Sequence, residues 1–223
     1  MSELVVQGGR GITLEDVDGA YAVVTIDRAH KRNAMDRAAR RDLHEILLAT
    51  AASGVRAVVL TGTERSFCSG VDLKEHADDL QRNVTDAPAT DWAELNLAIR
   101  SHPAIFIAAV NGTALGGGVT LIGVCDLALA AQDAVIGLPE LSFGAFPQLS
   151  GPAALFHLTP KRAAWLALTA GQIDGATAAD WGLVNEAMPA ETLMKRAREI
   201  ASRVAGFEPE ALARAKAALD AIP

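Results

Sequence analysis

The sequence is poor in cysteine and aromatic residues, and it contains no long uncharged apolar run. Its two cysteines, Cys68 and Cys125, form no C-x-x-C pair. This excludes a disulfide framework and a cysteine-based metal motif, so we expect two small buried thiols. No apolar stretch reaches the ~18 residues of a transmembrane helix, and the N-terminus lacks a signal-peptide core. We therefore expect a cytoplasmic protein that does not enter a membrane.

Positive charge is also scarce. The chain has 20 lysines and arginines against 27 aspartates and glutamates, a formal net charge of −7. This balance disfavours nucleic acid as a partner. The basic run AHKRNAMDRAARR at 29–41 is interrupted by Asp36, so we interpret it as a solvated face or a local anion contact. Half of the 223 residues are hydrophobic, enough for the core of one globular domain.

The common cofactor and metal motifs are missing. The glycine cluster has Leu121 where the third glycine of the dinucleotide-binding G-x-G-x-x-G belongs. The segment HEILL at His44 has Leu48 where the zinc-protease motif H-E-x-x-H requires a histidine. No P-loop motif is present, and no serine stands in G-x-S-x-G. We expect neither a metal nor a separate cofactor.

The hydrophobic pattern predicts an α/β fold. Five β-branched or apolar runs predict strands, namely GAYAVVTID, RAVVLTG, AIFIAAV, DLALA and AVIGL. Helical patterns alternate with them, and the first helix is capped by Asp36 with Leu43 and Leu47 on one face. Strands that alternate with helices need crossover connections, which indicates a mostly parallel sheet.

The end of the chain has a different character. After Gly151 the pattern predicts amphipathic helices, with a break at Thr159–Pro160 and one brief strand. We therefore divide the chain into a sheet-and-helix core at 1–150 and a helical region at 151–223, within one continuous domain. The polar stretch QRNVTDAPATD at 81–91 is a candidate flexible loop or lid.

Three adjacent glycines, Gly116–Gly118, follow the run AIFIAAV. Glycines cost backbone entropy, so a tight turn or a close approach to the main chain is expected there. A strand that leads into a helix presents N–H groups that a carbonyl oxygen can reach when side chains are absent. A second junction follows RAVVLTG, where Gly70 permits a turn and a helix begins near Asp72. Two such junctions would aim two N–H groups at one oxygen, and plain tight turns are the alternative interpretation.

Several longer motifs occur in a characteristic order: VRAVVLTG, SFCSGVDLKE, NGTALGGGVTLIGVCDLALA and IGLPELSFGAFP. RNAM at Arg32, LTAGQIDGATAADWGLVNEAMP and AKAAL continue the pattern. Together they resemble the crotonase superfamily, also called the enoyl-CoA hydratase/isomerase family. The resemblance extends over about residues 10–219.

The resemblance implies a crotonase-like spiral of ββα turns with a C-terminal helical region, assembled as a homotrimer or as a hexamer of two trimers. It implies an acyl-thioester substrate, in which coenzyme A is part of the substrate rather than a cofactor. Typical members continue through further helices beyond the position of Pro223, so the sequence is C-terminally short for the family. An acyl-carrier-protein thioester stays open as an alternative substrate.

The resemblance also implies functional residues. By motif position, two backbone N–H groups of an oxyanion hole fall on Val71 and Gly117, and a catalytic carboxylate falls on Glu140. The second carboxylate of the family hydratases falls on Thr120, so it is missing here. The other implied substrate-binding residues are Arg32, Asn33, Ala34, Ser69, Gly70, Asp72, Leu73, Lys74 and Gly116.

The missing carboxylate affects the choice of reaction. Concerted addition of water needs two acid–base groups, whereas one carboxylate can take a proton from one carbon and return it to another. We therefore rank double-bond isomerisation of an enoyl-CoA first. Hydration, decarboxylation and a non-catalytic crotonase-fold subunit stay open. Lys74 is either a phosphate partner or an ordinary surface residue, and Trp92 with the segment 76–91 is a candidate wall of the acyl tunnel.

Overall fold

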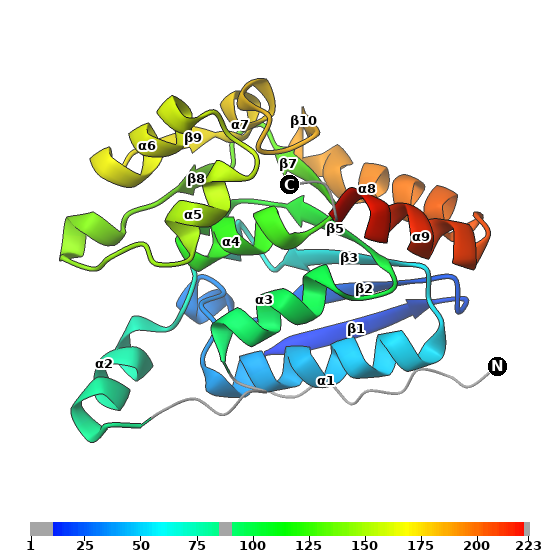
Figure 1. Cartoon of the computed structure of the whole chain (residues 1–223), viewed down its shortest axis with the longest axis horizontal. Helices are drawn as coiled ribbons and strands as arrows, with labels where there is room; N and C mark the ends of the chain where they lie inside the picture. The colour runs from blue at the N-terminus through cyan, green and yellow to red at the C-terminus, as the bar shows by residue number, and fades with distance from the viewer. Residues whose placement is uncertain (1–10, 85–90, 221–223) are drawn as a thin grey trace.

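A computed structural model describes residues 11–84 and 91–220 of the chain. Part of the expected loop at 81–91 therefore lies outside the described residues. The described chain forms two β-sheets with helices packed around them (Figure 1). This arrangement confirms the predicted α/β fold with a largely parallel sheet.

The larger sheet has six strands in the order β1-β2-β3-β5-β7-β10. Its strands are β1 (Ile12–Val17), β2 (Tyr21–Ile26), β3 (Ala57–Gly62), β5 (Ile105–Val110), β7 (Leu127–Ala131) and β10 (Glu186–Met188). Strands β1 and β2 pair antiparallel, and the pairs from β2 to β10 are parallel. Every residue of β5 is buried, which explains its uniformly apolar sequence in the middle of the sheet.

The smaller sheet has four short strands in the order β4-β6-β8-β9. They are β4 (Ser66–Cys68), β6 (Thr113–Leu115), β8 (Val135–Gly137) and β9 (Gln172–Asp174). From β3 to the helices that follow β8, the chain repeats one pattern: a strand of the larger sheet (β3, β5, β7), the next strand in the smaller sheet (β4, β6, β8), and then one or more helices. Strands of three residues carry little periodicity, and the hydrophobic pattern predicted β8 and β10 but not β4, β6 or β9.

The helices of the first part are α1 (Arg37–Ser53), α2 (Leu73–Arg82), α3 (Trp92–Arg100) and α4 (Gly117–Val124), with the 3₁₀ turns η1 (Ala29–Lys31) and η3 (Glu140–Phe143). Helix α1 begins as predicted, because the Asp36 carboxylate accepts a hydrogen bond from the Ala39 N–H at 2.9 Å. Its Leu43 and Leu47 side chains are buried. Helices α1, α3 and α4 pack one against the next.

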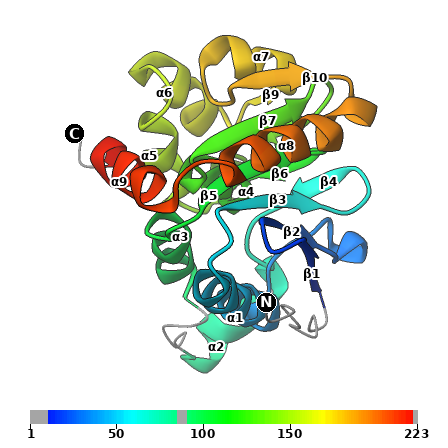
Figure 2. The same cartoon turned by 90° about the vertical axis from the view of Figure 1, so that its right-hand side faces the viewer.

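The last part of the chain contains α5 (Ser150–Leu155), α6 (Pro160–Thr169), α7 (Gly175–Trp181), α8 (Ala190–Ala205) and α9 (Pro209–Asp220). Pro160 is the first residue of α6, so the predicted helix break is present. The region is less purely helical than expected, because β9 joins the smaller sheet and β10 joins the larger one. Helix α8 packs across the strands of the larger sheet (Figure 2).

An ion pair between a buried lysine and a partly exposed aspartate attaches α9 to the sheet. The Lys216 ammonium donates hydrogen bonds to Asp126 Oδ2 at 2.9 Å and to the Ala104 carbonyl at 3.0 Å. These two acceptors stand just before β7 and β5, so one side chain links the last helix to two strand starts. Within the described ranges, no helix combines the length and apolar character needed to cross a bilayer.

Both cysteines are buried free thiols, as predicted. Burial raises the pKa of Cys68 to about 12, and it also raises the pKa of Cys125, to which the neighbouring Asp126 charge adds. Both side chains therefore stay protonated at neutral pH and serve as small apolar core groups.

Candidate active site

Two strand-to-helix junctions meet at one edge of the smaller sheet. Strand β4 leads through Ser69–Asp72 into α2, and strand β6 leads through Gly116 into α4. Strands β4 and β6 are parallel neighbours, so their carboxyl ends lie side by side. The two glycine-containing turns identified in the sequence are thus brought together by sheet pairing.

The main chains of the two junctions are in contact. A Cβ atom added to Gly70 would lie 3.0 Å from the amide nitrogen of Gly117 and 3.1 Å from the carbonyl oxygen of Leu115. Gly70 also has φ of +90°, a conformation that L side chains rarely adopt. Both the backbone angle and the lack of space explain why glycine stands here.

The Val71 amide faces away from its nearest backbone neighbour. Met35 N–H donates to Gly70 O at 2.8 Å, and Asp72 N–H donates to Met35 O at 3.2 Å. These bonds form a parallel bridge between Met35 and Val71, and in such a bridge the N–H of Val71 points to the other side. Among residues 11–84 and 91–220, neither the Val71 nor the Gly117 N–H has a hydrogen-bond acceptor.

Each of the three adjacent glycines has a different close neighbour. A Cβ at Gly116 would lie 3.0 Å from Glu140 Oε1, and a Cβ at Gly117 would lie 2.7 Å from the Trp92 ring. A Cβ at Gly118 would lie 2.0 Å from the Cys68 carbonyl oxygen. The bare backbone is therefore approached by a carboxylate, an indole ring and the β4 main chain.

Glu140 is held at the start of η3. Its Oε1 accepts a hydrogen bond from the Ser150 hydroxyl, at the first residue of α5. Its Oε2 is buried and has no hydrogen-bond partner within the described residues. A buried carboxylate oxygen without a partner is costly, and such atoms call for an explanation such as a catalytic role or a bound molecule.

Thr120, one helical turn after Gly116, is also buried, with 4% of its surface exposed. Its N–H donates to the Gly116 carbonyl at 3.3 Å. Its hydroxyl is buried and makes no hydrogen bond to any described residue. Glu140 and Thr120 therefore each present one unpartnered polar atom, and Gly116 contacts both residues.

The loop with the implied substrate-binding residues Arg32, Asn33 and Ala34 is built around Asn33, which is fully buried. Its Oδ1 accepts from the Arg28 N–H at 2.8 Å, and its Nδ2 donates to the Ser66 carbonyl at 2.6 Å. Asn33 thus uses its side chain to fix the loop, so any ligand contact here comes from the backbone. Ser69 N–H donates to the Arg32 carbonyl at 3.2 Å, which connects this loop to the Gly70 turn.

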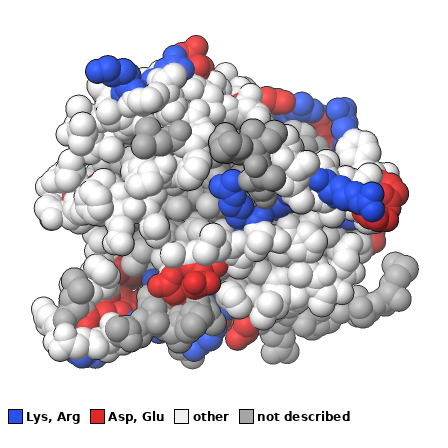
Figure 3. All heavy atoms as spheres, viewed as in Figure 1, with Lys and Arg blue, Asp and Glu red and all other residues white. Residues whose placement is uncertain are grey.

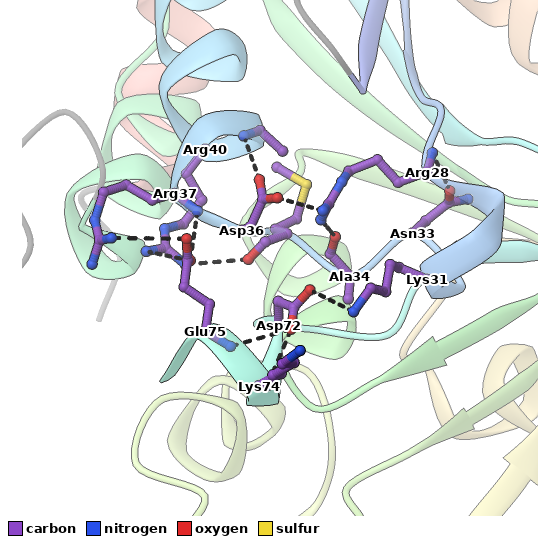
Figure 4. Close-up of polar contacts among 12 residues, drawn as sticks. Arg28, Lys31, Asn33, Ala34, Asp36, Arg37, Arg40, Asp72, Lys74 and Glu75 are labelled. Carbon is purple, nitrogen blue, oxygen red and sulfur yellow. Dashed lines mark hydrogen bonds and ion pairs between the residues drawn. The ribbon is translucent and has the colours of Figure 1, made fainter. Parts of the chain in front are cut away.

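The same loop carries a network of charges (Figure 4). Arg28, whose side chain is nearly buried, binds the Asp36 carboxylate and the Ala34 carbonyl. Lys31 lies 3.4 Å from Asp72, the N-cap residue of α2. The basic run at 29–41 is therefore largely matched by acidic residues rather than forming a free positive face. Further ion pairs join Arg37 and Arg40 to Glu75, and Arg37 to Asp79.

Asp72 is charged at neutral pH. Burial raises the pKa of this carboxyl group, but hydrogen bonds from the Glu75 and Lys74 N–H groups and the charge of Lys31 lower the pKa below its usual value overall.

Lys74 is exposed in the first turn of α2. A surface depression of about 300 Å³ is lined by Lys31, Asp36, Arg37, Asp72, Lys74, Glu75, Asp78, Asp79 and Arg82. Leu73, which stands between Asp72 and Lys74 in the sequence, is also exposed.

Apolar side chains are exposed next to Glu140. Within and after η3 these are Leu141, Phe143, Phe146 and Leu149, which expose between 39% and 76% of their surface. Figure 3 shows acidic and basic side chains in small separate groups on the face that it presents, with wide uncharged areas between them. The segment that holds the catalytic candidate is thus bordered by an apolar surface.

The sequence of the whole chain matches known proteins. The profile of the enoyl-CoA hydratase/isomerase family matches residues 16–222. The chain belongs to this family. It is 33% identical to 2,3-dehydroadipyl-CoA hydratase of Escherichia coli over 98% of its own length and 82% of the relative's. It is 32% identical to (E)-benzylidenesuccinyl-CoA hydratase of Thauera aromatica over 89% of its own length and 77% of the relative's.

Solved structures of the family share the fold. Enoyl-CoA hydratase from Bacillus anthracis matches with a TM-score of 0.87 and 30% identity, over 95% of this chain and 83% of that one. Pseudomonas aeruginosa AtuE matches with a TM-score of 0.86 and 34% identity, over 96% of this chain and 84% of that one. The crotonase fold predicted from the motifs is therefore confirmed.

The structure gives two residues definite contacts in this region. Ser150 contacts Glu140, and Trp92 covers Gly117. The sequence offered Trp92 only as a candidate wall of the acyl tunnel, and no periodicity relates Ser150 to Glu140. Their positions depend on how α3 and α5 pack against α4.

Proposed function

We propose that this protein is a crotonase-type enzyme that acts on an enoyl-CoA through an enolate. The observation that carries the proposal is the meeting of Gly70 and Gly117, with the carboxylate of Glu140 against Gly116. Two peptide N–H groups and one general base beside them are the groups that enolate chemistry needs. Family membership supports the thioester substrate.

In this proposal the thioester oxygen accepts hydrogen bonds from the N–H groups of Val71 and Gly117. Neither N–H is used by another described residue, so both are available to a ligand. Negative charge on that oxygen exists mainly in the transition state, and each such donor contributes about 100- to 1,000-fold in rate.

Glu140 is the proton carrier. With a 3-enoyl-CoA, its carboxylate takes a proton from C2, and the electron pair moves onto the thioester oxygen as a dienolate. The protonated carboxyl then returns that proton to C4, and the double bond shifts from C3–C4 to C2–C3. No water is consumed, so one carboxylate is enough, which fits threonine at position 120.

Hydration of a 2-enoyl-CoA is the second candidate. Several relatives are named as hydratases, including those from Escherichia coli and Thauera aromatica. The unpartnered Thr120 hydroxyl also supports this candidate, because it can hold a water molecule by a hydrogen bond. Glu140 would then be the only acid–base group for both the water and the C2 proton.

The CoA phosphates are proposed to lie beside the exposed Lys74 in the first turn of α2, whereas the other basic residues of the depression are matched by its carboxylates. The adenine would contact backbone groups at Arg32–Ala34, since the Asn33 side chain is already used within the loop. Acyl-carrier protein is the alternative carrier of the acyl group. Comparing kcat/KM for CoA and carrier-protein thioesters of the same acyl chain decides between them.

Self-assembly is a further part of the proposal. A homotrimer or hexamer would cover the exposed apolar residues between Leu141 and Leu149. Analytical ultracentrifugation measures the assembly directly. A purely monomeric protein at micromolar concentration would refute it.

The decisive experiment compares 3-enoyl-, 2-enoyl- and malonyl-CoA as substrates for the wild type and for Glu140→Gln. Isomerisation predicts formation of the conjugated 2-enoyl thioester from the 3-enoyl substrate, with a loss of at least about 100-fold in Glu140→Gln. The control Glu45→Gln changes an exposed carboxylate of α1 and should keep full activity. Turnover of only the 2-enoyl substrate would establish hydration, and turnover of only malonyl-CoA would establish decarboxylation. If wild type and Glu140→Gln are equally inactive on all three, the catalytic proposal is wrong.

A further inference from the structure

We infer that Ser150 is a positioning residue for Glu140: its hydroxyl holds one carboxylate oxygen and thereby dedicates the other to proton transfer. This inference rests on the proposed role of Glu140 and extends it to a second residue. Ser150 contacts no reacting atom in this scheme. It acts only through the carboxylate that it binds.

The two oxygens of Glu140 have different surroundings. Oε1 accepts the hydrogen bond from Ser150 and lies 3.0 Å from where a Cβ of Gly116 would be. Oε2 is buried, lies 3.9 Å from the same point, and has no partner within the described residues. The hydrogen bond therefore splits the carboxylate into a fixed oxygen and an oxygen that is available.

Ser150 is itself rigidly placed. Only 4% of its surface is exposed, and it is the first residue of α5. Helix α5 packs against α4, which begins at Gly117, the proposed oxyanion donor. The Ser150 hydroxyl therefore holds the Glu140 carboxylate in a fixed position relative to Gly117, because α5 carries Ser150 and packs directly against α4.

The hydrogen bond has two effects on the chemistry. It restricts rotation of the carboxylate about its last side-chain torsion, which is otherwise broad, so Oε2 keeps one orientation. It also leaves Oε2 without competing donors, so this oxygen is free to accept the substrate proton. Loss of the hydroxyl would lower the fraction of time that the base is correctly oriented, which lowers kcat rather than substrate binding.

The test uses an isosteric pair, Ser150→Thr and Ser150→Val, with the 3-enoyl-CoA that the wild type isomerises, or the 2-enoyl-CoA if it hydrates. Both variants add similar bulk at the same buried position, and only threonine keeps the hydroxyl. We expect kcat of Ser150→Val to be about tenfold to 100-fold below that of Ser150→Thr, with KM similar in the two. Ser150→Ala, which adds no bulk and lacks the hydroxyl, should have a kcat similar to that of Ser150→Val.

A double-variant comparison makes the result specific. In a Glu140→Gln background, Ser150→Ala should cause no further loss of kcat, because the two residues act as one unit. Equal kcat for the threonine and valine variants would overturn the inference, as would a full additional loss in the Glu140→Gln background. If Glu140→Gln alone retains wild-type activity, the proposed function itself fails, which is a distinguishable result.

Discussion

Gly70 and Gly117, from two separate turns, lie so close that a single added carbon on Gly70 would come within 3.0 Å of the Gly117 nitrogen. The pairing of β4 with β6 creates this contact. It brings the turns that carry both proposed oxyanion donors together, and a side chain at Gly70 would push the Gly117 and Leu115 backbone away by a few tenths of an ångström.

Gly70→Ala is therefore expected to reduce activity by at least about 100-fold, because the new methyl group displaces one of the two donors. Gly54→Ala is the matched control. Gly54 also has positive φ, +79°, but no atom lies within 4 Å of its added Cβ. Gly54→Ala should cost about 1 kcal/mol in stability through its backbone angle and leave kcat/KM unchanged. Equal activity losses in both variants would show that backbone strain, not the Gly117 contact, controls activity.

Thr120→Val tests the role of the unpartnered hydroxyl. Removing a buried hydroxyl that makes no hydrogen bond should keep stability constant or raise it by about 1 kcal/mol. Thr50→Val is the control, because Thr50 Oγ1 donates to the Ile46 carbonyl at 2.8 Å. That change should lower the free energy of unfolding by about 1 kcal/mol.

The same Thr120→Val variant separates the two candidate reactions. Isomerisation needs no water, so its rate should change by less than about threefold, within the range of a small packing effect. A much larger loss with a 2-enoyl-CoA would instead support a water molecule bound by Thr120. Urea unfolding and steady-state kinetics on one preparation provide both answers.

Lys216→Met should destabilise the fold by about 1.5–3 kcal/mol, because it removes a buried cation that donates to the partly exposed Asp126 carboxylate. The matched control is Lys161→Met, in which an exposed lysine of α6 is replaced. It should change stability by less than about 0.5 kcal/mol. Denaturant midpoints measure both, and similar midpoints would mean that the Lys216 contact contributes little.

His102 predicts a specific dependence of stability on pH. Its pKa is lowered from 6.5 to about 4: burial is the main cause, a hydrogen bond to the Leu47 carbonyl opposes it, and the charge of Lys216 adds a smaller lowering effect. Between pH 6.5 and about 4 the unfolded chain therefore binds the proton that the folded chain excludes. Stability should fall as the pH decreases through this window, by up to about 3 kcal/mol from this residue.

His102→Gln should remove this part of the acid loss, measured as the pH slope of the free energy of unfolding. His76→Gln, at an exposed position on α2, is the control and should keep the wild-type slope. An unchanged slope in His102→Gln would mean that another group titrates in that window.

Much of the molecule could be read from local sequence. The β-branched and apolar runs gave β2, β3, β5, β7 and β8, and Asp36 and Pro160 marked the starts of α1 and α6. These signals are local because strand and helix periodicity, capping and proline geometry involve residues only a few positions apart. The motif order also identified the family, which the profile match confirms.

The candidate site was only partly accessible in this way. Motif position implied roles for Val71, Gly117 and Glu140, but it did not show that Gly70 approaches Gly117 or that Trp92 covers it. It also did not relate Ser150 to Glu140. These contacts come from sheet register and helix packing between segments distant in sequence. The hydrophobic pattern of each segment by itself therefore cannot predict them. The amino-acid sequence alone determined which glycine turns and which carboxylate the site could contain. The tertiary structure decided which of their atoms meet, because the pairing of β4 with β6 sets the distance between Gly70 and Gly117, which no local preference of the chain can set.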